Sequence, residues 1–93
     1  MSLTTDKIQK IIDAIPETEE MLSVKDELSI IKSDIESEII VDDEDALIDV
    51  YYILLAEFNT PIEDWHFTVS SIWLDIPESQ VREKVQEGWR LFK

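Results

Sequence analysis

The feature that most constrains the fold is a run of four acids, Asp42 to Asp45, that leads directly into the most apolar segment of the chain, residues 46–56. Apolar residues in this segment would cover most of the circumference of a helix, which is typical of a helix buried at the centre of a domain. Carboxylates suit the start of such a helix, because its first turn carries unpaired N–H groups and a partial positive charge. We therefore expect a central apolar helix over residues 43–58.

The segments before this helix repeat apolar residues every three or four positions, which predicts two further helices. The first stripe lies within 8–15 and ends at Pro16, because the residue before a proline is pushed away from helical backbone. The second stripe runs over 21–39. It would place Asp34 and Glu38 four residues apart, and therefore on the same face near the end of that helix.

The clearest local signal follows the central segment. Thr60 can act as an N-cap, Pro61 suits the first helical position, and Glu63 completes the spacing of a capping box. This pattern predicts a fourth helix that begins at Pro61. Residues 66–69 can also be read as a short strand.

A last helix is expected after Pro77, with its apolar stripe over 81–92. Gly88, the only glycine, lies in the last turns of this stripe, where it would either permit close helix packing or mark fraying. No linker or internal repeat divides the chain. We expect one all-α domain over residues 1–93, built from about five short helices packed around the helix at 43–58.

Composition excludes several classes of protein. The chain has 93 residues and no cysteine, which removes disulfides, thiolate zinc sites and cysteine nucleophiles. No apolar run approaches the roughly 18 residues of a membrane span. The N-terminus lacks a basic segment followed by an apolar one, as a secretory signal would have. We expect a cytoplasmic protein.

The net charge of −14 is concentrated in one part of the sequence, which we call the acidic block. Between Ser33 and Gln80 there are 13 acids and no lysine or arginine, while the remaining residues hold 9 acids and all 8 bases. Nucleic acids and anionic membranes are disfavoured as partners, because contacts to phosphate need basic side chains. The natural partner is a cation or a basic protein.

Calcium fits the acidic junction, because it takes six to eight oxygen ligands in flexible geometry, whereas magnesium demands strict octahedral geometry. An EF-hand loop is absent, since a loop beginning at Asp42 would have Ala46 at its fifth position and Leu47 at its glycine position. Any site would be assembled from a helix end, a junction and a third segment. The candidate calcium ligands are Glu38, Asp42, Asp43, Asp45, Glu63 and Asp64.

Catalysis finds little support in the sequence. His66 is the only histidine, and without cysteine it cannot build a zinc site by itself. No carboxylate pair is distinguished as acid and base, and no glycine-rich loop could hold phosphate, so we expect no enzyme. The large aromatic residues fall on apolar stripes and are expected in the core: Tyr51, Tyr52, Trp65, Trp73 and Trp89.

A small, cysteine-free and strongly acidic helical chain with charge concentrated over 36–38 and 41–45 resembles the CcbP-type calcium-binding proteins of cyanobacteria. The resemblance lies in size and charge and includes no alignable motif. It implies a cytosolic calcium buffer or signalling protein that uses acidic residues without an EF-hand.

The acidic block also permits two interpretations that do not involve calcium. Calcium binding is the leading prediction, and its alternative is an acidic inhibitor, either an immunity or a decoy protein that mimics nucleic acid and covers the basic site of a nuclease or DNA-binding protein. The acidic block could also be a solvated surface with helix caps.

Overall fold

The structure is a computed structural model that describes residues 3–39, 42–57, 61–89 and 91, and within these residues it contains five helices and no strand. The helices are α1 (Leu3–Ala14), α2 (Glu19–Glu36), α3 (Asp43–Glu57), α4 (Asp64–Leu74) and α5 (Glu78–Gln86). The predicted all-α class is confirmed. The alternative of a strand at 66–69 is wrong, because those residues lie within α4.

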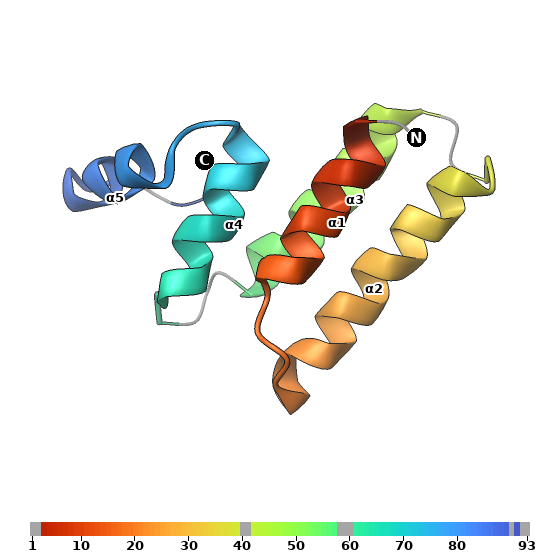
Figure 1. Ribbon diagram of the computed structural model, residues 1–93, viewed down its shortest axis with the longest axis horizontal. Helices are drawn as coiled ribbons and strands as arrows, with labels where there is room; N and C mark the ends of the chain where they lie inside the picture. The colour runs from red at the N-terminus through yellow and green to blue at the C-terminus, as the bar shows by residue number, and fades with distance from the viewer. Residues whose placement is uncertain (1–2, 40–41, 58–60, 90, 92–93) are drawn as a thin grey trace.

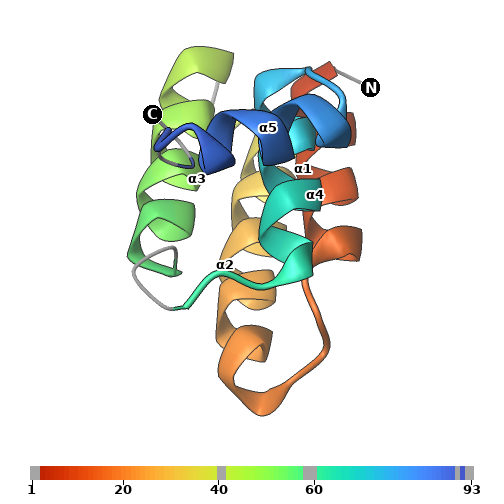
Figure 2. The same cartoon turned by 90° about the vertical axis from the view of Figure 1, so that its left-hand side faces the viewer.

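The first three helices run side by side, α4 packs against α1, and α5 is the outermost element (Figure 1). Figure 2 shows α5 lying across α4, the one helix that it contacts among the described elements. Among the described elements, α1 has its backbone close to three others, namely α2, α3 and α4. The helix at the centre of the fold is therefore α1, in which Ile8 and Ile11 have no exposed surface.

Helix α3 contributes to the core but is covered on fewer sides than predicted. It ends at Glu57, and Phe58 lies outside the described residues. Its backbone lies close to α2 and α1, and Tyr51 contacts Trp73 of α4 with ring centroids 6.3 Å apart. It buries a narrow stripe of Ala46, Val50 and Leu54. Apolar residues surround α3, but neighbouring helices cover only one side of it.

Buried apolar side chains from, or next to, the first four helices form one core. They are Ile8, Ile11, Ile15, Met21, Val24, Leu28, Ile31, Ala46, Val50, Leu54 and Val69. Burying one such leucine or isoleucine contributes about 1.5–3 kcal/mol to stability. Trp65, Trp73 and Tyr51 pack against this core as predicted. Tyr52 does not, because 65% of its surface is exposed.

The start of α4 differs from the prediction. Pro61 to Glu63 are not helical, and Thr60 lies outside the described residues. Glu63 is itself the N-cap residue, with φ −117° and ψ 168°, and its backbone N–H donates a hydrogen bond of 2.8 Å to Nδ1 of His66. His66 stands three residues after the N-cap, where a side-chain acceptor can satisfy the N-cap amide. The helix therefore starts three residues later than the proline pattern suggests.

The end of α2 also differs from the prediction. The helix stops at Glu36, and Glu38 adopts a left-handed conformation with φ 60°. The backbone N–H of Ile39 donates to the carbonyl of Asp34 at 2.9 Å, and that of Glu38 donates to Ile35 at 3.2 Å. These two bonds form a Schellman motif, which closes the helix. Asp34 and Glu38 consequently do not share a helical face.

Gly88 ends α5 in the same way. Its φ is 93°, its N–H donates to Val85 at 3.0 Å, and the N–H of Trp89 donates to Lys84 at 2.9 Å. A Cβ placed on Gly88 would meet no heavy atom within 4 Å, so the glycine does not serve close packing. Its role is conformational, because glycine adopts positive φ without strain. Trp89 lies beyond the helix, and the far end of the predicted stripe, Phe92, lies outside the described residues.

Candidate binding surface

The six carboxylates predicted as calcium ligands occupy separate places in the fold. Glu38 lies in the turn after α2, residues 42–45 start α3, and Glu63 and Asp64 start α4. In both views the chain enters α4 toward the lower end of the molecule, where α3 also ends (Figures 1 and 2). Since α3 has 15 residues, its two ends are roughly 22 Å apart. The structure therefore does not bring the third segment, 63–64, to the acids at 42–45.

Several of the predicted ligands have structural partners. Oδ1 of Asp42 accepts a hydrogen bond of 2.9 Å from the N–H of Glu44, as an N-cap of α3 does. Oε2 of Glu63 accepts a bond of 2.7 Å from Nε1 of Trp65, and Asp64 pairs with Arg82 at 3.6 Å. Over the part of the chain that the structure describes, no group of three or more histidine, aspartate or glutamate side chains is arranged to hold a metal ion.

The solvent face of α3, which we define as Asp45, Ile48, Asp49, Tyr52 and Leu55, combines carboxylates with large apolar side chains. All five residues are exposed, and Ile48 and Tyr52 leave 51% and 65% of their surface uncovered. Neither carboxylate forms an ion pair with any described residue. The sequence prediction missed this face. A signal for it was present, because in a small domain neighbouring helices rarely cover every side of a helix that is apolar all around.

A shallow groove of about 390 Å³ separates this face from α2. We call it the α2–α3 groove, and its lining residues are Glu27, Ile30, Ile31, Asp49, Tyr52 and Ile53. Ile31 is buried, whereas Ile30 on the same helix is 60% exposed. The groove therefore has an apolar interior, with one carboxylate from each helix among its lining residues.

Two other hollows have different character. A hollow of about 620 Å³ lies between the α1–α2 connection and the start of α4, with Glu57 and Pro61 in its wall. The other hollow, of about 420 Å³, is lined by both acidic and basic side chains, including Asp75 and Lys7. An ion pair of 3.7 Å already joins these two side chains.

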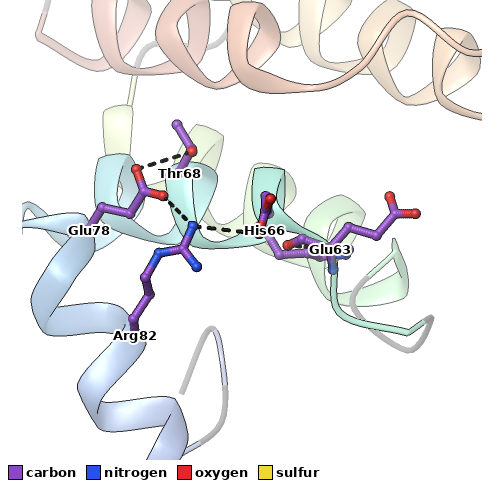
Figure 3. A network of polar contacts seen from close by, with 6 residues as sticks. Glu63, His66, Thr68, Glu78 and Arg82 are labelled. Carbon is purple, nitrogen blue, oxygen red and sulfur yellow. Dashed lines mark hydrogen bonds and ion pairs between the residues drawn. The ribbon is translucent and has the colours of Figure 1, made fainter.

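Helices α4 and α5 meet at a charge cluster centred on Arg82 (Figure 3). The Arg82 guanidinium lies 3.0 Å from Glu78 and 3.6 Å from Asp64, and its Cζ stands 4.4 Å from the centre of the Phe67 ring. Thr68 donates a hydrogen bond of 3.4 Å to Glu78. One arginine thus joins an aromatic ring and a carboxylate of α4 to a carboxylate of α5.

His66 is a buried structural residue, with 1% of its surface exposed and its ring stacked on Trp65 at a centroid distance of 3.9 Å. Burial lowers the pKa of His66, against the opposing effects of the Glu63 carbonyl and of the Glu63 and Glu57 charges. Because Nδ1 accepts the N–H of Glu63, the neutral ring suits this site.

None of the helices formed by the described residues is long and apolar enough to cross a bilayer. Comparison with known proteins yields no matching family model, no matching curated protein and no matching solved structure.

Proposed function

We propose that this chain is a non-enzymatic binding protein whose α3 solvent face docks on a basic surface of another protein, as an acidic inhibitor or nucleic-acid mimic does. The observation that supports this proposal is the combination of Asp45 and Asp49 with exposed Ile48, Tyr52 and Leu55 on one helix face. Protein interfaces place aromatic and apolar anchors at the centre and polar groups around them.

The charge of the chain selects the kind of partner. A net charge of −14 accelerates encounter with a basic protein and opposes binding to nucleic acid or to an anionic membrane. It also opposes a symmetric dimer through the same face, since Asp45 and Asp49 would meet their own copies. A basic protein is the partner that satisfies both the apolar and the acidic residues of this face.

Calcium binding is the competing proposal. Its support is the exposure of Glu38, Asp43 and Asp45, none of which forms an ion pair with a described residue. A calcium ion would relieve the repulsion between such carboxylates. The described residues hold no ready group of three ligands, so calcium would have to draw side chains together. Because drawing like charges together costs free energy, we rank calcium binding below the protein partner.

The main proposal is tested by identifying a partner from the native lysate by mass spectrometry and rebuilding the complex from purified components. We expect a basic protein whose dissociation constant rises steeply between about 50 and 300 mM salt, because screening weakens charge attraction. Replacing Ile48 and Tyr52 together with serine should abolish binding without altering net charge. An unaffected complex would contradict the proposal.

A matched pair of double variants distinguishes the effect of charge on the α3 solvent face from the effect of net charge on binding. Asp45→Asn with Asp49→Asn removes two charges from the α3 solvent face, and Glu83→Gln with Glu87→Gln removes two charges from the region of α5. The first pair should weaken binding much more than the second. Equal weakening would mean that only net charge matters.

The calcium proposal is tested by calorimetric titration in about 0.1 M salt, with magnesium as the control. A saturable site of about micromolar affinity, together with a melting temperature raised by calcium but not by magnesium, would support calcium over the protein partner. If calcium behaves as magnesium does, the calcium proposal fails.

A further inference from the structure

Building on the proposed function, we propose that the α2–α3 groove receives an arginine side chain of the basic partner. The groove offers three components that suit arginine: an exposed aromatic ring, a carboxylate from each helix, and an apolar interior. These are, respectively, Tyr52, the pair Glu27 and Asp49, and the isoleucines beside them.

The two carboxylates of the groove are available to a partner. Glu27 and Asp49 are exposed, and neither forms an ion pair with any residue that the structure describes. Tyr52 contacts Tyr51 edge to face, with ring centroids 6.0 Å apart, and such a contact covers at most one face of a ring. Since 65% of the Tyr52 surface is exposed, a face of its ring is open to a planar cation. The groove thus presents negative charge next to an aromatic face, which attracts a guanidinium group.

The α4–α5 junction shows the same combination with its arginine in place. There the Arg82 guanidinium lies over Phe67 at 4.4 Å and pairs with carboxylates of two different helices at 3.0 and 3.6 Å. The α2–α3 groove also has an aromatic ring and a carboxylate from each of two helices, but no basic residue is among those that line it. A partner arginine would supply the missing member.

Arginine fits these components better than lysine does. Its planar guanidinium can stack on Tyr52 while its N–H groups reach a carboxylate, and its weaker hydration lowers the cost of entering an apolar groove. Its aliphatic stem would lie along the exposed Ile30. A lysine ammonium is a compact and strongly hydrated charge, so it gains from the carboxylates but less from the ring.

The test uses the full-length ¹⁵N-labelled chain and two short synthetic peptides of equal charge. Both peptides have lysines near their ends and leucines around a central residue, which is arginine in one and lysine in the other. We expect the arginine peptide to shift the amide signals of residues 27–31 and 49–53. It should bind about three- to five-fold more tightly than the lysine peptide, as a cation–π contact implies.

Variants of Tyr52 separate ring stacking from general attraction. Tyr52→Ala should reduce the preference for arginine to nothing measurable, whereas Tyr52→Phe keeps the ring and should retain the preference. Both changes are at an exposed site, so circular dichroism should show an unchanged fold. An equal loss in the two variants would overturn the stacking arrangement.

Three further outcomes would overturn the groove, and the first two leave the proposed function standing. Equal affinity for both peptides, or signal shifts confined to the hollow near the start of α4, would mean that charge alone attracts them. A dimer in sedimentation that protects Tyr52 would identify a second copy as the occupant. The proposed function fails separately, if the purified natural partner binds with no salt dependence or away from the α3 solvent face.

Discussion

The α4–α5 junction and the α2–α3 groove both gather carboxylates from two helices near an aromatic ring, and they differ in whether an arginine completes the cluster. At the junction, Arg82 pairs with Glu78 and Asp64 and joins two helices. At the groove, Glu27 and Asp49 remain exposed. The comparison separates acids that help to hold the fold together from acids that remain available to a partner.

The same contrast exists within α3. Its inner stripe belongs to the core, whereas the five residues of its solvent face are exposed. A face kept for a partner should contribute little to the stability of the free chain. Stability measurements can therefore test the comparison without any knowledge of the partner.

The largest effect is expected from the adjacent leucines of α3, of which Leu54 belongs to the inner stripe and Leu55 to the solvent face. Leu54 is fully buried, so Leu54→Ala should lower the free energy of unfolding by about 2–5 kcal/mol through lost burial and a cavity. Leu55 is 39% exposed, and Leu55→Ala should cost less than about 1 kcal/mol. Urea denaturation measures both. Equal losses would show that the solvent face is packed after all.

The second-largest effect is expected at the charge cluster centred on Arg82. Arg82→Ala should lower the free energy of unfolding by about 1 kcal/mol, since it removes two partly exposed ion pairs and the contact with Phe67. Arg82→Lys should recover only part of this loss, because lysine lacks the planar fork. Thermal unfolding of the three proteins compares them. Full recovery by lysine would remove the basis for an arginine-specific groove.

A similar or smaller loss is expected at the start of α3, where one acid caps the helix and its neighbours are surplus. Asp42→Ala should cost about 1 kcal/mol, and Asp42→Asn should cost little, because asparagine caps equally well. Asp45→Asn should change stability by no more than about 0.5 kcal/mol. If all three variants instead stabilise the metal-free chain, repulsion dominates, as the calcium proposal requires.

The smallest effect is a pH dependence that comes from His66. Burial lowers its folded-state pKa, and the Glu63 carbonyl and the charges of Glu63 and Glu57 raise the pKa again in part. The unfolded chain therefore takes up this proton first as the pH falls through the ordinary value of 6.5. The stability that neutral His66 contributes is fully present above that pH and is lost as the pH falls towards the lowered folded-state value.

Chemical denaturation between about pH 7.5 and 5.5 should show this loss in the wild type. His66→Gln is the control, because glutamine three residues after the N-cap can still accept the Glu63 amide but does not titrate. If the free energy of unfolding of His66→Gln changes with pH as it does in the wild type, the pH dependence comes from other groups.

Periodicity and local chemistry in the sequence were sufficient for the helices themselves. The apolar stripe before Pro16 and the stripe that begins at Met21 became α1 and α2, with the intervening break where proline requires it. The acids from Asp43 onwards begin α3, because the helix dipole favours them there. Charge counting also located the acidic block, since charge is a property of composition.

Tertiary structure alone decided which apolar residues were covered. A pattern that is apolar on all sides cannot show which side of α3 meets α1 and α2, so Tyr52 was assigned to the core although it faces solvent. The start of α4 at a capping box of Glu63 and His66, rather than at Pro61 as predicted, depended on where the His66 ring was buried.

The same distinction between local pattern and packing applies to the candidate binding surface. The sequence by itself determined that the chain is helical and that its surplus of acid lies between Ser33 and Gln80. Only the packing of α3 against α2 decided that Glu27 and Asp49 line one groove. The physical reason is that local patterns act over a few residues, whereas a site depends on which helices pack together.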